Sequence, residues 1–417
     1  MTGIDPRDNL DEHTQQHLRT LLRAPGLAEV FAALGPRDAR IVGGAVRNAL
    51  LGQPVTDIDI ATTLPPREAM ARLRRAGFSV HPVGIEHGSI IAAKDGRAFE
   101  VTTLRRDVKT DGRHAQVAFT TDWAQDALRR DFTMNAIYLD ADGRLHDHVG
   151  GLADLKAHRL RFIGDAARRI REDYLRILRF FRFWATYAAA PPDDETLATI
   201  TAQRQGLKRI SKERIRQETR RLLSAPKAVE ALRLMERTGV ADMIFPADCA
   251  RDLTALERMA AQDAALDLAP EWFLRLIAFC GPHESLRQAF RLTREETKRL
   301  RWLAKAARPA DEQEWKRLIY HHGPQAARDL ARLAAARGNL PEEGLRGLLT
   351  LLERWHPPTF LPGGKDAVAL GLPPGPAVGE ALRRAEERFV ANGFAPADRA
   401  GQIALLREVV ADMRGTK

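Results

Sequence analysis

The feature that most constrains the fold is an apolar run that ends in two adjacent glycines and is followed by a helical pattern. Ile41 and Val42 predict a strand, and Gly43-Gly44 allow the backbone to approach a ligand closely with its amide groups facing outward. A helix that starts near Ala45 would direct its positive N-terminal end to the same point, which suits a phosphate group. The glycine spacing differs from the dinucleotide-binding fingerprint. The segment therefore predicts a strand–turn–helix unit beside a phosphate-containing ligand.

Two aspartates stand one residue apart shortly after this turn. On a strand, Asp57 and Asp59 would point to the same face. Such carboxylates repel each other unless a cation lies between them, and hard oxygen ligands favour Mg²⁺. Glu100, on a further β-like run, offers a third carboxylate, and three carboxylates can hold two ions about 4 Å apart for phosphoryl displacement. A bare Asp-x-Asp is usually a solvated strand surface, so the preceding glycine turn is what favours a metal site.

The chain has 417 residues, too many for a single core, and its character changes near residue 150. Short β-rich runs alternate with helical patterns before that point, whereas helical spacing dominates beyond about Asp165. We therefore predict an α+β fold with a mixed sheet and helices in an N-terminal head, followed by an all-α remainder. The expected domains are a head (1–150), a neck (151–225), a body (226–356) and a tail (357–417), of which the last three are helical.

Local patterns place the individual elements. Basic helices are expected at 168–186 and 209–223, and the Pro/Gly-rich stretch 357–375 predicts a linker to a last helical unit at 376–415. In the head, the expected strands are 39–43, 58–61, 89–93, 98–103, 116–120 and 135–139, and the expected helices are 9–23, 45–51 and 67–76.

Composition limits the class of protein. The net charge of +10 attracts polyanions, of which nucleic acid is the commonest, although a general arginine bias would give the same charge. Two cysteines, Cys249 and Cys280, exclude a disulfide framework and a four-cysteine zinc site. We find neither a membrane-length apolar stretch nor a signal pattern, so we expect a cytoplasmic protein without a membrane partner or a stable protein partner.

The glycine turn and the aspartate pair together resemble motif A of the class II tRNA nucleotidyltransferases and bacterial poly(A) polymerases, in the DNA polymerase β-like superfamily. The resemblance implies a catalytic polymerase β-like head in which Asp57, Asp59 and Glu100 are catalytic and hold two Mg²⁺ ions. It also implies a neck that recognises the base, a body that binds RNA and a tail that binds tRNA. Asn48 stands where the family usually has aspartate, which affects a local contact and leaves the aspartate pair intact. The matching residues are Gly43-Gly44-x-Val46-Arg47, Leu50-Leu51-Gly52 and Asp57-x-Asp59-x-Ala61-Thr62, of which Gly43, Gly44 and Arg47 are expected to bind the nucleotide.

The run at 129–136 resembles motif B of the same family. It implies that Arg130 grips the triphosphate and that Asp131 and Asn135 hydrogen-bond ribose hydroxyls, which would select ribonucleotides. Asp126, four residues before Arg130, can orient that arginine, or it can form a helix-face ion pair of little energetic value.

The Glu-Asp-x-x-Arg element at 172–176 resembles motif D. On a helix, Asp173 and Arg176 would share a face. A carboxylate accepts from an exocyclic amine and a guanidinium donates to a ring nitrogen or carbonyl, so the pair can read a base edge. In the family it acts as a protein template for CTP or ATP, and Arg179 is expected beside it in the nucleotide site. Without the preceding motifs, the pair would be interpreted as an ordinary intrahelical ion pair.

Other segments resemble further family elements. Residues 145–155 resemble the connecting motif C, in which His146 is expected as a turn residue, and 209–215 resemble motif E, which braces the neck. The loop between motifs A and B, with Asp111, Arg113 and His114, corresponds to a flexible loop that the family needs to switch from C to A addition. The pair His321-His322 is expected on the surface.

The resemblance covers about residues 40–223 and implies attack by the tRNA 3′-hydroxyl on the α-phosphate of CTP or ATP. The expected partner is the tRNA acceptor arm, bound by shape and charge; residues 201–240 carry 11 Lys and Arg against 4 Asp and Glu. A poly(A) polymerase or an A-adding enzyme with the same head remains an alternative, although 83–89 resembles the segment usual in tRNA nucleotidyltransferases. A third alternative is a non-catalytic RNA-binding protein. The three intact carboxylates disfavour this alternative.

Overall fold

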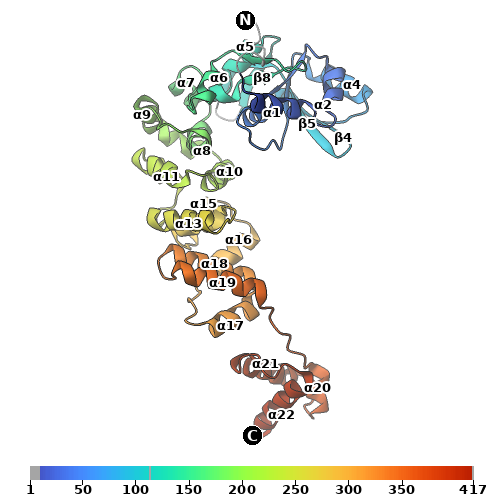
Figure 1. The fold of residues 1–417 in the computed structure, drawn as a ribbon, viewed down its shortest axis with the longest axis vertical. Coiled ribbons are helices and arrows are strands. Elements are labelled where there is room, and N and C mark those ends of the chain that lie inside the picture. The colour runs from blue at the N-terminus through green and yellow to red at the C-terminus, as the bar shows by residue number, and fades with distance from the viewer. Residues whose placement is uncertain (1–9, 112–113, 416–417) are drawn as a thin grey trace. The chain divides into compact units, whose positions relative to one another are not determined.

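The computed structural model describes residues 10–111 and 114–415. Its contacts divide the chain into two compact units: residues up to 247 together with 285–291, and residues 248–284 together with those from 292 onward. All strands that the structure describes lie in the first unit, and the described part of the second consists of helices and their connections (Figure 1). The predicted α+β head followed by a helical remainder is therefore confirmed, whereas the boundaries of neck, body and tail stay predictions.

A seven-stranded mixed sheet forms the centre of the head (Figure 1). The strand order is β3-β4-β5-β2-β1-β8-β9, in which β2 and β5 run parallel and every other neighbouring pair is antiparallel. A separate hairpin follows β5. The strands of the sheet are β1 (Ala39–Val42), β2 (Asp59–Thr62), β3 (Ser79–Gly84), β4 (Ser89–Lys94), β5 (Arg97–Thr103), β8 (Ile137–Leu139) and β9 (Leu145–Asp147), and the hairpin consists of β6 (Arg105–Asp111) and β7 (His114–Phe119).

The predicted strands and helices of the head are all present with shifted bounds, although 116–120 belongs to the hairpin and not to the sheet. The helices are α1 (Glu12–Leu22), α2 (Leu27–Leu34), α3 (Gly44–Leu50), α4 (Pro66–Arg75) and α5 (Trp123–Leu128). Five helices and strands of the head were not predicted: α2, α5, β3, β6 and β9. The expectation that His146 is a turn residue is wrong, because it lies in β9, where its ring Nε2 is 2.8 Å from Asp140 Oδ2.

The helix predicted at 168–186 is interrupted at Asp173. This residue has an extended backbone (φ −154°, ψ 105°), and its carboxylate accepts the backbone N–H of Leu175 at 3.1 Å. A short polar side chain that captures a nearby backbone donor competes with the helix in this way. The helices that complete the first unit are α6 (Gly151–Lys156), α7 (Ala166–Glu172), α8 (Leu175–Tyr187), α9 (Asp194–Gln203), α10 (Lys212–Leu223), α11 (Ala228–Arg237), α12 (Ala241–Ile244) and α15 (Ser285–Ala289).

In the second unit, the stretch predicted as a linker contains a helix, α20, whose Ala367 packs against Leu406. His321 and His322 are exposed, as predicted. Cys249 and Cys280 form a single disulfide within this unit. The helices described in 10–111 and 114–415 are all too short or too polar to span a bilayer. Those of the second unit are α13 (Leu253–Ala265), α14 (Trp272–Cys280), α16 (Arg294–Leu303), α17 (Glu312–His322), α18 (Pro324–Ala336), α19 (Glu342–Arg354), α20 (Gly364–Ala369), α21 (Pro376–Ala391) and α22 (Arg399–Gly415).

A cluster of buried phenylalanines joins the head to α8. Phe132 lies 4.9 Å from Phe162 and 5.2 Å from Phe183 between ring centroids. Phe180, on the same helix as Phe183, stacks on Phe162 at 5.6 Å with the rings nearly parallel. Aromatic pairs in such arrangements are stabilising beyond their burial alone. This cluster fixes the position of α8 relative to the segment that resembles motif B.

Replacement of Phe180 by alanine should therefore destabilise the first unit strongly. Phe180 is 1% exposed, and a buried Phe→Ala change costs about 3–5 kcal/mol because it leaves a cavity. Urea unfolding followed by circular dichroism measures the loss. Leu128→Ala, at a side chain that is 55% exposed in the same unit, should change the stability by less than about 0.5 kcal/mol. Equal effects of the two changes would contradict the proposed role of the cluster.

Candidate active site

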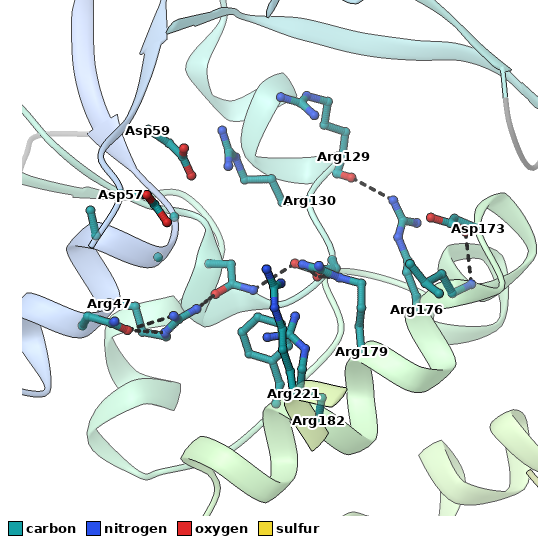
Figure 2. Close-up of a pocket in the computed structure, with 18 of the residues that line it drawn as sticks. Arg47, Asp57, Asp59, Arg129, Arg130, Asp173, Arg176, Arg179, Arg182 and Arg221 are labelled. Carbon is teal, nitrogen blue, oxygen red and sulfur yellow. Dashed lines mark hydrogen bonds and ion pairs between the residues drawn. The ribbon is translucent and has the colours of Figure 1, made fainter. Parts of the chain in front are cut away.

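A pocket of about 770 Å³ opens beside the glycine turn (Figure 2). It is lined by the turn itself, the segment before β2, the motif B segment, the α7–α8 junction and α10, with nine arginines against four aspartates. All nine residues predicted to bind the nucleotide lie in its wall: Gly43, Gly44, Arg47, Arg130, Asp131, Asn135, Asp173, Arg176 and Arg179. Motifs that are up to about 130 residues apart in sequence are thus brought together.

The glycine turn lies directly beside an acidic side chain. Gly43 has φ 77° and ψ −130°, a conformation that favours glycine, and its carbonyl accepts the N–H of Arg47 at 3.1 Å in the first turn of α3. A Cβ on Gly43 would lie 3.7 Å from Asp59 Oδ2. A side chain at this position would be strained and would extend toward the carboxylate, so the glycine keeps the floor of the pocket open.

The aspartate pair lines the pocket together, although only one member is on a strand (Figure 2). Asp59 begins β2, whereas Asp57 precedes it, so the expectation that both occupy one strand is wrong. Asp59 is in register with Glu100 of β5. Burial raises the pKa of Asp59, and the negative charges of Glu100 and Asp57 raise it further against the opposing effect of Arg130. Three like charges therefore interact at this end of the sheet.

Glu100 itself is exposed and is not part of the pocket wall. Among the described residues, no group of three or more His, Cys, Asp or Glu side chains is arranged to hold a metal ion. The metal role of Asp57, Asp59 and Glu100 stays a prediction. The same holds for the flexible loop: Asp111 pairs with His114 in the backbone of the hairpin, and Arg113 lies outside the described residues.

A buried carboxylate orients two arginines at the pocket. Asp126 is fully buried and accepts from Arg129 Nε at 2.7 Å, from Arg130 Nη2 at 3.0 Å and from the hydroxyl of Tyr138 at 2.8 Å. Burial alone would raise the pKa of Asp126, but Arg130 and Arg129 outweigh it and lower the pKa to about 2. The structure therefore favours the orienting role of Asp126 over that of a surface ion pair.

A second chain of hydrogen bonds runs from the motif B segment to α3. Asp131, 8% exposed, accepts from Arg179 Nε at 2.7 Å and from Asn135 Nδ2 at 3.1 Å. Asn135 Oδ1 in turn accepts from Arg47 Nη1 at 2.5 Å, and Arg47 Nη2 donates to the hydroxyl of Tyr187 at 2.8 Å. The residues predicted to touch ribose thus bond to one another and fix the position of α8.

Asn48, the departure from the family pattern, has two partners that explain it. Its Oδ1 accepts from Arg47 Nη2 at 2.8 Å, and its Nδ2 donates to the carbonyl of Pro54 at 2.9 Å. An aspartate would keep the first bond but cannot donate the second. The amide therefore ties α3 to the segment that leads to the aspartate pair.

The base-reading pair is held by neighbours that the sequence did not reveal. Arg214 of α10 donates to Asp173 through Nη2 at 2.7 Å and Nη1 at 3.3 Å. Arg176 donates to Glu172 Oε2 at 2.8 Å. It also donates to the carbonyl of Arg129 at 3.3 Å (Figure 2). The sequence-based picture of one helix face is wrong, since Asp173 lies at the break between α7 and α8.

The pocket wall also contains residues that the sequence analysis did not assign to the nucleotide site. Arg182 donates to Glu218 at 2.5 Å, and Arg221 lies beside it on the pocket (Figure 2). The sequence predicted a basic helix at 209–223, which corresponds to α10, but neither that pattern nor the excess of basic residues in 201–240 singled out individual side chains. The unassigned residues are Ala45, Val55, Thr56, Arg105, Arg129, Leu175, Arg182, Phe183, Arg214 and Arg221.

Comparison with known families matches two parts of the chain. Residues 39–161 match the poly A polymerase head domain, and residues 192–249 match the probable RNA and SrmB-binding site of polymerase A. These segments contain the glycine turn, the aspartate pair, the motif B segment and α10.

Full-length relatives carry more specific names. The chain is 38% identical over 373 residues to CCA tRNA nucleotidyltransferase 1, mitochondrial, of Danio rerio, which covers 87% of this chain and 86% of the relative. It is 32% identical over 382 residues to the CCA-adding enzyme of Streptococcus gordonii, covering 89% and 93%. The solved Bacillus stearothermophilus CCA-adding enzyme in complex with CTP superimposes with a TM-score of 0.75 at 30% identity, over 94% of this chain and all of that one.

The buried carboxylates predict how the stability of the first unit depends on pH. Burial raises the pKa of Asp131, but Arg179 and its hydrogen bonds lower it to about 2, as for Asp126. A carboxyl whose pKa is lower in the folded state stabilises the protein fully at a pH above its pKa in the unfolded state, which is near 3.8. This stabilisation is lost as the pH falls through about 2. Each group should contribute about 2 kcal/mol.

Urea unfolding between about pH 5 and about pH 2 tests this dependence. Asp126→Asn should reduce the acid-dependent loss of unfolding free energy by about 2 kcal/mol, whatever its effect on the stability at neutral pH. Asp142→Asn, at an exposed position, should leave the pH dependence as in the wild type. If Asp126→Asn has the same pH slope as the wild type, the assignment of the depressed pKa to this carboxyl is incorrect.

Proposed function

Because the chain belongs to the CCA-adding family of class II tRNA nucleotidyltransferases, we propose that it adds C, C and A to the 3′ end of tRNA from CTP and ATP, releasing pyrophosphate. The observation that supports this most directly is the single pocket that gathers the aspartate pair and all nine predicted nucleotide-binding residues. Residues in this one wall can contact the triphosphate, the ribose and the base of a single nucleotide.

The arginine-rich wall suits a triphosphate. Arg129 and Arg130 are oriented by the buried Asp126, so their guanidinium groups reach the pocket without the entropic cost of ordering free side chains. Asp131 and Asn135 lie between Arg179 and Arg47 and present their remaining acceptor and donor capacity to ribose hydroxyls. A ribonucleotide is therefore the donor that this wall fits.

The acidic side chains fit the Mg²⁺ ions that the family implies. Asp57 and Asp59 face the same space in Figure 2, and Glu100 lies opposite Asp59 in the sheet, which crowds three negative charges. A divalent cation between them would relieve their repulsion. We propose that Asp57 and Asp59, with Glu100, hold two ions; when bound, such ions lower the pKa of the attacking 3′-hydroxyl and neutralise the triphosphate.

The base is read at the junction of α7 and α8. Asp173 accepts and Arg176 donates, and both side chains lie in the pocket wall. Arg214 and Glu172 hold them in place, so the two groups are ready before a base arrives. This preorganisation supports selection of C and A by hydrogen bonding without a nucleic-acid template.

The acceptor and the cellular location are the finer parts of the proposal. The basic surface of α10 supports binding of the tRNA acceptor arm through phosphates. The curated relatives in fish, mouse and human are mitochondrial forms. A cytoplasmic location stays a prediction, as does the expectation that the chain needs neither a membrane nor a stable protein partner.

A tRNA that lacks its last three nucleotides tests the proposed activity. With CTP alone the wild-type protein should add two nucleotides and stop; with CTP and ATP it should add three. Asp59→Asn should reduce incorporation at least about 100-fold, because it removes a charge from the reacting centre, while Asp142→Asn should not.

A long A tract from ATP alone would instead identify a poly(A) polymerase, and addition of A only to a tRNA that already ends in CC would identify an A-adding enzyme. Full activity of Asp59→Asn would refute the placement of the reacting centre.

Arg176→Ala should change the choice of nucleotide more than the affinity for triphosphate. The substitution removes a donor to the base, and a buried acceptor left unpaired costs about 1–3 kcal/mol, or about 10-fold to 100-fold in discrimination. Single-nucleotide incorporation with each of the four NTPs measures the change. Arg171→Ala, an exposed arginine on α7 outside this pocket, is the control. An equal loss for all four nucleotides would show that Arg176 has only a structural role.

A further inference from the structure

An exposed apolar surface lies where the β6–β7 hairpin meets the turn after β3. Phe119, the last residue of β7, is 45% exposed, and Ile85 of the 3₁₀ turn η1 (Ile85–His87) is 38% exposed. Val83, at the end of β3, is 64% exposed. Nothing in the mechanism above uses these side chains.

The ring of Phe119 is held in place from one side. Gly88 has φ +83°, and a Cβ on it would lie 2.8 Å from Phe119 Cε1, so the ring rests directly on the glycine backbone. The Gly88 carbonyl accepts the N–H of Thr103 at 2.9 Å, and Arg105 Nη1 donates to the carbonyl of His87. The turn under the ring is therefore fixed, while the other side of the ring remains accessible.

This surface is continuous with the wall of the active-site pocket. Phe119 and Arg105 are cross-strand partners at the base of the hairpin, so their side chains are direct neighbours on one face. Arg105 also lines the pocket. It follows β5 closely, the strand on which Glu100 lies opposite Asp59. The ring thus lies next to the pocket wall at Arg105.

The incoming nucleotide does not account for this surface. Its base is read by Asp173 and Arg176, which come from the α7–α8 junction. The second substrate must bring a 3′-hydroxyl to the aspartate pair. The bases that precede that hydroxyl are unpaired, and unpaired bases bind to exposed aromatic rings with a basic side chain nearby.

We propose that Phe119, with Arg105 beside it, is a stacking surface for the unpaired 3′-terminal base of the acceptor RNA. Stacking needs only a ring face and not a base edge, so one surface serves the RNA as its last base changes during addition. This inference rests on the proposed function, because it assigns the acceptor side of the same site.

Three variants of Phe119 and one control at another position test the inference. Phe119→Ala and Phe119→Leu both remove the ring, but leucine still covers Gly88 with an apolar side chain; Phe119→Trp keeps an aromatic ring. Leu128→Ala, at a 55% exposed apolar side chain of α5 that is not part of the pocket wall, is the control. The measurements are the Kd of a fluorescently labelled tRNA ending in CC, by anisotropy, and the KM of ATP at saturating RNA.

The alanine and leucine variants should weaken RNA binding about 10-fold, because loss of one stacked base has about this effect, and they should leave the KM of ATP unchanged. The tryptophan variant and the control should bind RNA as the wild type does. An unchanged RNA affinity in both the alanine and the leucine variant would overturn the inference. Normal RNA binding by Phe119→Leu alone would also overturn it, because an apolar contact without stacking would then be sufficient.

Two other outcomes also decide the matter. An equal rise in the KM of ATP would show that Phe119 supports the pocket structurally, which contradicts the inference. Loss of self-association on substitution, with RNA affinity unchanged, would identify a second copy of the chain as the occupant. Because RNA affinity is measured without catalysis, a wild-type protein that fails to incorporate nucleotides would refute the proposed function while the anisotropy data still decide the role of Phe119.

Discussion

The arrangement of the pocket depends on the hydrogen bonds of the buried Asp131 carboxylate. It accepts hydrogen bonds from Arg179 of α8 and from Asn135 of the motif B segment. Asn135 in turn accepts a hydrogen bond from Arg47 of α3. These bonds hold α8, the motif B segment and α3 in one arrangement. A buried charge that lost its partner would be very costly, so this set of bonds forms as a unit or not at all. The phenylalanine cluster beside it supplies the apolar burial that such a polar network requires.

The positive charge of most of the pocket depends on which of its aspartates form ion pairs with arginines. Asp131 and Asp173 are each bound by an arginine, Arg179 and Arg214. The other two aspartates of the wall lie together on the opposite side, so the nine arginines exceed the acidic groups around most of the cavity. A ligand with several negative charges is what this excess attracts. The same separation leaves one acidic point at which a cation and a triphosphate can meet.

Much of the site could be predicted because its motifs are local. Each motif can be recognised from a few neighbouring residues, as is the case for the glycine turn, the aspartate pair and the residues at 129–136. What could not be predicted depends on tertiary contacts: Arg214 reaches Asp173 from 41 residues away, and Asp126 is buried only because the hairpin and β8 pack over it. The break at Asp173 depends on a hydrogen bond to the backbone that helical periodicity does not reveal. Helix α20 was missed because its Pro/Gly-rich flanks resemble a linker, while a single buried Ala367 anchors it.

The lone pairs of Asp173 suggest how a fixed protein surface accepts two different bases. An ionised carboxylate offers about four acceptor positions. Its Oδ1 already accepts from Leu175 and from Arg214, and its Oδ2 accepts once from Arg214. One position on Oδ2 is left for a single further donor. Cytosine and adenine each present one exocyclic amine, whereas guanine and uracil present a carbonyl oxygen at the corresponding place. On the proposed function, a carboxylate saturated to this degree would accept C and A alike and would repel the other two bases, and Arg214 would matter because it keeps that last position aimed into the pocket.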